Sequence, residues 1–283
     1  MEFVTLNNGI KMPKVGFGVF QMADSAQCEQ AVLEAIHTGY RLIDTAAIYM
    51  NEEAVGVALK KCDVAREELF ITTKLWVQDV GYEETKIAFQ TSLDKLGLDY
   101  LDLYLIHQPI GDYYASYRAF EELYKEGKIR AIGVSNFYPD RLVDLCMNVD
   151  VIPAVNQIEL HPFFQQENAL KIMKEFHVQA EAWGPLAEGK HGIFKDPILL
   201  EIALKYGKTV AQVVLRWSIQ RDVVVIPKSM NKNRIIENID IWDFELSKED
   251  MNKITVLDLG HSEIVDHRNP EFIKAMIGYK IHE

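Results

Sequence analysis

The chain alternates short apolar runs with longer segments in which apolar residues recur every three or four positions. This alternation predicts β-strands followed by amphipathic helices, because a buried strand is a short apolar run and a helix buries only one face. The strands we expect, in chain order, are Val15–Gly18, Leu42–Asp44, Phe70–Lys74, Leu101–His107, Ile129–Ser135, Ala154–Glu159, Gln179–Trp183 and Val223–Pro227. The pattern therefore predicts a succession of βα units.

A hairpin is expected before the first of these strands. The stretch FVTLNNGIKM holds two short β-rich runs joined at Asn8-Gly9, a dipeptide typical of tight turns. The helix that follows the first strand has a clear start and end, because Asp24 or Ser25 can cap its N-terminus and Gly39 is placed to end it. Local signals thus agree with the larger pattern.

Eight βα units can form an open, doubly wound sheet or a closed (β/α)8 barrel. Polar or ionisable residues end or follow nearly every strand: Asp44, Lys74, His107, Ser135, Gln157 and Lys228. In a barrel all strand ends share one rim, whereas in an open sheet the second and eighth lie far apart. The Gly-x-Gly-x-x-Gly fingerprint of open sheets is missing after the first strand. We therefore expect a barrel, and, since no linker or shift in composition divides the chain, a single domain over residues 1–283.

Composition narrows the class of partner. The chain of 283 residues is 48% apolar, and its 30 basic and 42 acidic residues give a net charge of −12. This charge repels nucleic acid and anionic membranes, so a bound phosphate must meet a local cluster of Lys and Arg. Three widely spaced cysteines, Cys28, Cys62 and Cys146, are expected to be reduced, buried thiols. Without a secretory leader or a long apolar run, we expect a cytoplasmic monomer with no membrane or nucleic-acid partner.

Asp44 ends an apolar strand, and an uncompensated carboxylate there costs several kcal/mol as an order of magnitude, so it needs a partner. In a barrel the ends of strands two, three and four are neighbours. They would bring Lys74 and His107 to Asp44, with Tyr49 in the loop after strand two. We expect Asp44 to keep Lys74 charged, and the ammonium to lower the pKa of Tyr49. Each residue alone has an ordinary structural explanation, but the four together are far more specific.

The contexts of these residues resemble one family. The stretches GYRLIDTAAIYMNE, LGLDYLDLYLIHQP, IRAIGVSNF, NQIELHP and IPKSMNKNRIIEN occur in the order and spacing of the aldo-keto reductases, a resemblance that extends to about Arg268. It implies a (β/α)8 TIM barrel with an N-terminal β-hairpin and a C-terminal tail over the barrel. It also implies NADPH-dependent reduction of a small aldehyde, ketone or keto sugar acid, as in the compact bacterial-type members. The implied catalytic tetrad is Asp44, Tyr49, Lys74 and His107.

The resemblance also implies cofactor contacts. The nicotinamide carboxamide would be held by Ser135, Asn136 and Gln157, and Trp183 would stack on the nicotinamide, followed by Gly184, Pro185 and Leu186. The 2′-phosphate of NADPH would be bound by Lys228, Ser229 and Arg234, with Glu237 and Asn238 near the adenine. A phosphate on an acidic protein does need dedicated cations.

The implied substrate pocket departs from the family pattern. Its lining would be His107, Phe20, Trp76 and Gln108. Gln108 stands where many members carry Trp, which removes an aromatic wall. Trp183 stands where many carry Tyr, and Gly184 replaces a common Ser.

Two alternatives compete with the reductase. His161 and His107 suggest a metal hydrolase, but no His-x-His pair or clustered carboxylates accompany them, so we expect no metal and a structural role for His161. The other alternative is an NADPH-binding sensor or regulatory barrel with little turnover.

Overall fold

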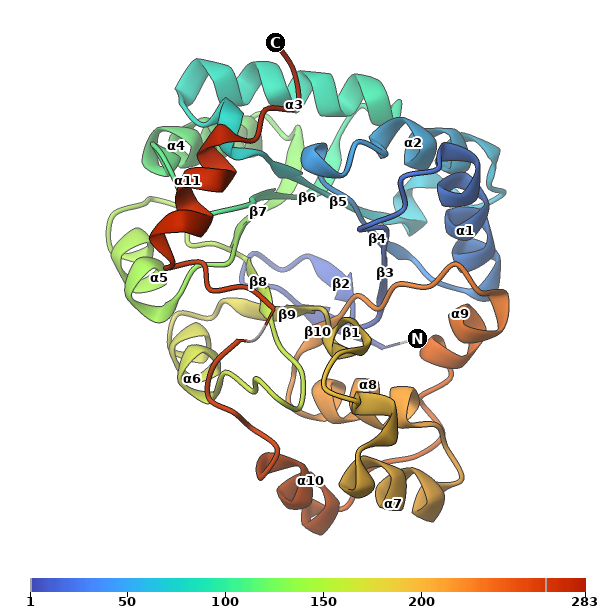
Figure 1. Cartoon of the computed structure of the whole chain (residues 1–283). Coiled ribbons are helices and arrows are strands. Elements are labelled where there is room, and N and C mark those ends of the chain that lie inside the picture. The colour runs from blue at the N-terminus through green and yellow to red at the C-terminus, as the bar shows by residue number, and fades with distance from the viewer. Residues whose placement is uncertain (1, 263) are drawn as a thin grey trace.

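The computed structural model describes residues 2–262 and 264–283; Met1, the first residue of the predicted domain, and Glu263 lie outside them. Eight strands form one parallel sheet, and they are β3 (Gly16–Gly18), β4 (Leu42–Asp44), β5 (Phe70–Leu75), β6 (Leu101–Ile106), β7 (Ile129–Ser135), β8 (Val155–Glu159), β9 (Gln179–Trp183) and β10 (Val224–Val225). The first and last strands meet, because Val15 pairs in parallel with Val225 and the Val225 N–H donates to the Lys14 carbonyl at 3.0 Å. The predicted closed barrel is therefore confirmed (Figure 1).

Helices surround the barrel, as Figure 1 shows. They are α1 (Ser25–Thr38), α2 (Glu52–Lys61), α3 (Tyr82–Leu96), α4 (Tyr113–Lys125), α5 (Pro139–Cys146), α6 (Glu167–Glu175), α7 (Pro197–Tyr206), α8 (Val210–Gln220) and α9 (Lys232–Ile239), followed by α10 (Lys248–Thr255) and α11 (Pro270–Gly278). Short 3-10 turns are η1 (Ala47–Tyr49), η2 (Arg66–Glu68), η3 (Val77–Asp79), η4 (Ala187–Gly189) and η5 (Ile193–Lys195). The first helix follows its sequence signals: the Asp24 carboxylate caps it by accepting from Gln27 N, and Gly39, at φ 111°, ends it in the left-handed conformation.

Most predicted strand bounds hold within one residue, but the last strand is shorter than expected. Only Val224 and Val225 of the predicted Val223–Pro227 pair with β9. The Ile226 N–H reaches the Ala182 carbonyl at a long 3.4 Å, and Pro227 has no N–H to offer a ladder. The Pro227 carbonyl instead accepts from Gly18 N at 3.2 Å, which helps to close the barrel next to the rim.

The N-terminal hairpin, β1 (Phe3–Thr5) and β2 (Lys11–Pro13), covers the amino end of the barrel. Buried Leu6 and Met12 belong to one apolar cluster with residues that line the bottom of the barrel: Leu42, Phe70, Leu103, Ala131 and Val155. The side chain of Asn8 donates to the Arg130 carbonyl at 2.9 Å, which fixes the hairpin turn against β7. Because this end is covered, a ligand must enter at the carboxyl ends of the strands.

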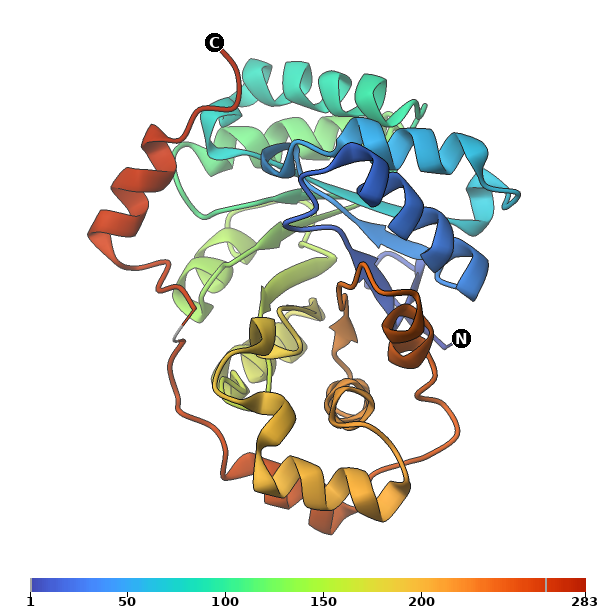
Figure 2. The ribbon, with the colours of Figure 1, turned by 45° about the vertical axis from the view of Figure 1, so that its right-hand side comes forward.

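The C-terminal tail passes over the carboxyl end of the barrel, as predicted, and Figure 2 shows α11 standing along one side of it. The Trp76 indole N–H donates to the Tyr279 carbonyl at 2.9 Å. Gln78 makes two further contacts with backbone atoms of the tail, accepting from Ile281 N at 2.8 Å and donating to the His282 carbonyl at 2.9 Å. These contacts fasten the tail to the loop after β5.

Two other expectations concern cysteines and membranes. All three cysteines are free thiols, but Cys62 is only half-buried, since it lies at the end of α2, whereas Cys28 and Cys146 are buried. Within residues 2–262 and 264–283, no helix combines the length and the apolar character needed to cross a bilayer.

Candidate functional site

A large cleft opens at the carboxyl ends of the strands, with an empty volume of about 2860 Å³ when its open mouth is included. This space is ample for a dinucleotide together with a small substrate. Among the predicted site residues, those that line the cleft are Phe20, Asp44, Tyr49, Trp76, His107, Gln108, Ser135, Asn136, Gln157, Trp183, Gly184, Pro185, Leu186, Lys228, Ser229, Arg234, Glu237 and Asn238. Of the predicted site residues, only Lys74 does not line the cleft, and its ammonium contacts Tyr49, which does.

Asp44 has the partner that its position requires. Lys74 Nζ lies 2.5 Å from Asp44 Oδ1 and also donates to the Thr45 carbonyl at 2.9 Å. Tyr49 Oη lies 3.3 Å from the same ammonium. Neither member of the ion pair is exposed by more than 2%. Asp44, Lys74 and Tyr49 thus form a chain of polar contacts from a buried carboxylate, through a buried ammonium, to a phenol at the cleft surface.

The pKa of Lys74 is shifted in the expected direction, but the pKa of Tyr49 is not. Burial alone lowers the pKa of Lys74, but the attraction of Asp44 and Tyr49 and the hydrogen bond to Asp44 outweigh it, so the pKa is raised and the lysine stays charged. Burial raises the pKa of Tyr49; the nearby Lys74 ammonium lowers it only in part, and Asp44 raises it further. The ammonium has the predicted effect, but burial outweighs it, so the prediction of a lowered pKa for Tyr49 is wrong. The phenol is protonated at neutral pH, which is the form that a proton donor needs.

His107 is a neutral, buried imidazole beside the phenol. Burial, and then the charge of Lys74, hold the pKa of His107 well below its usual range. Its ring packs edge-on against the rings of Tyr49, at 5.7 Å between centroids, and of Trp76, at 5.5 Å. His107 Nδ1 is buried without a hydrogen-bond partner among the described residues, so Nε2 is the nitrogen available to a ligand in the cleft.

The predicted carboxamide-binding residues are largely engaged with one another. The Ser135 hydroxyl donates to the Gln157 backbone carbonyl at 2.9 Å. Asn136 donates to the His107 carbonyl at 3.0 Å and accepts from the Trp183 indole N–H at 2.8 Å. This last contact fixes the plane of the tryptophan that is expected to stack on the nicotinamide.

The opposite end of the cleft is cationic. Lys228 and Arg234 are both exposed, and neither makes an ion pair within the described part of the chain. Ser229 is buried, and its hydroxyl accepts from Asn231 N at 3.1 Å. Glu237 accepts from the Thr209 hydroxyl at 2.8 Å. Two unpaired cations at a cleft of an acidic protein are suited to a phosphate group.

The C-terminal tail completes the cleft at the end where Trp76 and Gln108 lie. The sequence does not indicate which residues of the tail face the cleft. Those that line it are Ile264, Val265, His267, Phe272, Met276 and Tyr279. Burial lowers the pKa of His267 to about 4, so it is a neutral ring at pH 7. This end of the cleft is thus lined by aromatic, aliphatic and neutral polar side chains.

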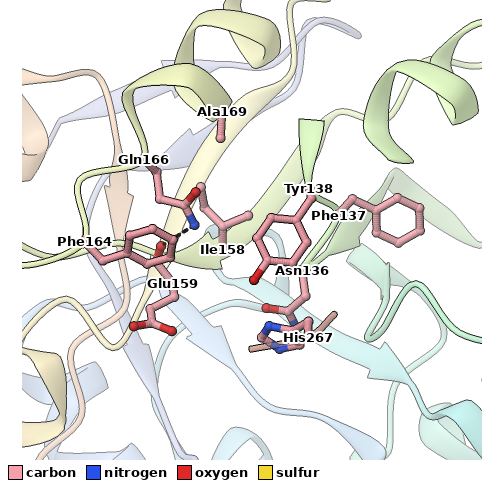
Figure 3. A pocket seen from close by; sticks show the side chains of 9 residues that line it. All are labelled: Asn136, Phe137, Tyr138, Ile158, Glu159, Phe164, Gln166, Ala169 and His267. Atoms are coloured by element: carbon pink, nitrogen blue, oxygen red, sulfur yellow. Dashed lines mark hydrogen bonds between the residues drawn. The ribbon is translucent and has the colours of Figure 1, made fainter. Parts of the chain in front are cut away.

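A second, small pocket adjoins the cleft at Asn136 and His267 (Figure 3). One of its walls is Glu159, whose carboxylate accepts from the Ser262 hydroxyl at 2.6 Å and lies 3.0 Å from His161 Nε2. This buried contact gives His161 a structural partner. No group of three or more His, Cys, Asp or Glu side chains that could hold a metal occurs among the residues described.

Sequence reasoning overlooked Glu181, a fully buried carboxyl in β9 that bonds to Gln157. The signal was the same as for Asp44, since Glu181 is an acidic residue inside an apolar strand, in QAEAW.

Comparison with known proteins gives a consistent result. The model of the "Aldo/keto reductase family" matches residues 14–258. The chain is 53% identical to glyoxal reductase of Bacillus subtilis (strain 168) over 257 residues, which cover 90% of this chain and 92% of the relative. It is 46% identical to methylglyoxal reductase DkgA of Escherichia coli (strain K12) over 260 residues, or 91% and 94% of the two chains. A crystal structure of Bombyx mori aldo-keto reductase (AKR2E4) in complex with NADP superposes with a TM-score of 0.89 at 37% identity, covering 94% of this chain and 95% of the other.

Proposed function

Because the chain belongs to the aldo/keto reductase family of NADP(H)-dependent oxidoreductases that act on carbonyl groups, we propose that it reduces small, uncharged aldehydes and ketones with NADPH. Tyr49 is the proton donor in this proposal. The observation that carries it is the buried Asp44–Lys74 ion pair, whose ammonium lies 3.3 Å from the phenol oxygen at the cleft surface.

The chemistry of the cleft fits NADPH. Lys228 and Arg234 are unpaired cations at one end within the described residues, and they suit the 2′-phosphate. Trp183, held by Asn136, offers an aromatic face to the nicotinamide, and Gln157 offers an amide to its carboxamide. When bound, NADPH supplies the hydride.

The residues of the chain then handle the proton and the negative charge. Tyr49 donates its proton to the carbonyl oxygen of the substrate, and Lys74 stabilises the phenolate that remains. Asp44 keeps Lys74 charged in its buried position. Since His107 is neutral and its Nδ1 is buried with no partner in the described part of the chain, we infer that it carries its proton on Nε2 and donates a hydrogen bond to the same carbonyl oxygen.

The charges of the cleft favour an uncharged substrate over a keto sugar acid. The cationic side chains of the described cleft lining are Lys208, Lys228 and Arg234, all on the side of α7 to α9, whereas Lys74 lies behind the lining and is paired with Asp44. Among the residues that the structure describes, the lining around Trp76, Gln108 and the tail offers no free cation to a carboxylate. The two relatives named above are called glyoxal reductase and methylglyoxal reductase, and glyoxal and methylglyoxal are small uncharged carbonyls as well.

The matched pair glyoxal and glyoxylate tests both parts of the proposal. They are similar in size, but only glyoxylate carries a carboxylate. We expect consumption of NADPH with glyoxal, with a kcat/KM at least tenfold above that for glyoxylate, since one unpaired buried charge costs about 1.4 kcal/mol or more. Tyr49→Phe should abolish most of the turnover while retaining NADPH binding. Binding of NADPH without turnover of any carbonyl would favour the regulatory alternative, and full activity of Tyr49→Phe would exclude Tyr49 as the donor.

A further inference from the structure

Glu181 is a buried acidic residue that takes no part in the reaction described above. It lies in β9 with no exposed surface. Its Oε2 accepts a hydrogen bond at 2.9 Å from Gln157 Nε2, and its Oε1 has no partner among the described residues. A buried carboxyl that is only half satisfied is costly, so its presence beside the cleft calls for a physical reason.

Gln157 is held by two carboxyl groups at once. Its Nε2 donates to Asp44 Oδ2 at 2.8 Å and to Glu181 Oε2 at 2.9 Å. A primary amide has two N–H donors and one carbonyl acceptor, so both donors are used by these two contacts. A flipped amide would place its carbonyl oxygen against Oδ2 of Asp44, a carboxylate oxygen that can only accept. The contacts therefore fix the amide with its carbonyl oxygen turned away from both.

The polar side chains next to Gln157 already use their hydrogen-bonding groups within the protein. The Ser135 hydroxyl donates to a backbone carbonyl, and the Asn136 side-chain oxygen accepts from the Trp183 indole N–H. Gln157 lines the cleft, and no described residue donates to its side-chain oxygen. Of these three side chains, Gln157 thus offers the free amide acceptor to a ligand N–H.

We propose that Glu181 is a positioning residue for the cofactor: together with Asp44 it holds the Gln157 amide so that its carbonyl oxygen accepts an N–H of the nicotinamide carboxamide. The proposal rests on the proposed function in one respect, since it takes the nicotinamide to lie at Gln157. Glu181 acts through Gln157 and does not touch the reacting atoms.

The charge balance of the site agrees with this role. Lys74 is neutralised by Asp44, so an ionised Glu181 would add a buried charge with no cation of its own. Burial, and then the nearby Asp44, raise the pKa of Glu181 to about 8 although Gln157 and Lys74 lower it. At neutral pH Glu181 is therefore mostly uncharged, and its carbonyl oxygen still accepts from Gln157. A glutamine can do the same.

Equilibrium binding of two ligands tests the proposal without turnover. NADPH carries the nicotinamide, whereas adenosine 2′,5′-bisphosphate carries only the phosphate-bearing adenosine end. We expect Glu181→Leu to raise the Kd for NADPH about five- to tenfold, the loss expected for one misplaced hydrogen bond, and to leave the Kd for adenosine 2′,5′-bisphosphate unchanged. Glu181→Gln should bind both ligands like the wild type. Glu52→Leu is a matched control, because Glu52 is also buried but bonds to Thr73 and lies outside the cleft.

Folding of each variant is checked by circular dichroism, and Glu181→Met, which keeps the length of the side chain, replaces the leucine variant if that one is unfolded. Equal weakening of both ligands, or a loss of NADPH affinity in Glu52→Leu of the same size, would overturn the proposal. So would wild-type affinity for NADPH in the leucine and methionine variants. Because the comparison needs no reaction, failure of the protein to reduce any carbonyl would defeat the proposed function and leave this result intact.

Discussion

Replacing Asp44 with asparagine tests whether the buried carboxylate acts through the proton donor. Lys74 has no exposed surface, and its ammonium lies 2.5 Å from Asp44 and 3.3 Å from Tyr49. Removing one partner of a buried ion pair costs about 3–5 kcal/mol if the other charge stays. In Asp44→Asn this penalty falls on protonated Lys74, and burial now lowers its pKa without opposition from Asp44. We expect the lysine to lose its charge.

The size of the rate loss follows from the contact between Lys74 and Tyr49. A hydrogen bond to a charged group contributes about 1.5–3 kcal/mol, which corresponds to roughly 10- to 150-fold in rate. This is the loss expected for Asp44→Asn. Tyr49→Phe removes the donor itself, and general acid catalysis supplies about 10²–10⁴-fold. If Asp44 acts only through Lys74 and Tyr49, the double variant is little slower than Tyr49→Phe alone.

The assay is single-turnover oxidation of NADPH by glyoxal after rapid mixing, in the wild type, both single variants and the double variant. Asp44 also accepts a hydrogen bond from Gln157, so NADPH affinity is measured separately and the cofactor is kept saturating. Lys74→Met is the control, and adding Asp44→Asn to it should change little. Losses that simply multiply in the Asp44→Asn/Tyr49→Phe variant would refute the reasoning and leave Asp44 as a structural carboxylate at a strand end.

Three further predictions address the cofactor, the substrate and stability. Arg234→Ala should raise the KM for NADPH about tenfold and leave that for NADH nearly unchanged; equal losses in steady-state kinetics would defeat the phosphate assignment. Gln108→Trp should shift kcat/KM from glyoxal toward benzaldehyde without changing NADPH affinity, and an unaltered substrate profile would place Gln108 outside the substrate site. Asp250 is buried, yet hydrogen bonds from Lys205, Ser247 and Tyr206 lower its pKa from 3.8 to about 2. A lowered folded-state pKa stabilises the fold above pH 4, and here it contributes about 2 kcal/mol to the free energy of unfolding. In urea unfolding of the wild type, this contribution should disappear between pH 4 and pH 2. The Asp250→Asn variant should not show that loss.

The ion pair of Asp44 could be predicted from the sequence because its signal is local. A carboxylate at the end of an apolar run needs a cation, and in a closed barrel the end of the next strand is the nearest place to find one. The sign of the pKa shift at Tyr49 could not be predicted in this way. It depends on whether burial or the ammonium dominates, and the depth of a loop residue is set by packing from other parts of the chain, such as Phe20, whose ring lies 5.0 Å from that of Tyr49.

The position of the C-terminal tail carries even less signal in the sequence. Trp76 bonds to the backbone carbonyl of Tyr279, and Gln78 bonds to backbone atoms of Ile281 and His282. Such contacts require a backbone group and place no demand on the side chain of the tail residue. The resemblance to the family could therefore place a tail over the barrel, while the residues that face the cleft, among them His267, came only from the structure.

Strand register explains why the polar groups of the site meet. Ser135 pairs with Gln157 across β7 and β8, and Gln157 pairs with Glu181 across β8 and β9. In parallel strands, paired residues point to the same face, so these side chains lie at one level of the barrel. A slip of β9 by one residue would turn Glu181 outward and bring an alanine, Ala180 or Ala182, to its place. The amide of Gln157 would then lose one of its two carboxyl partners. The orientation that we propose for the cofactor is thus a consequence of sheet register. A slipped β9 and the Glu181→Leu substitution would both remove the same hydrogen bond between Gln157 and Glu181.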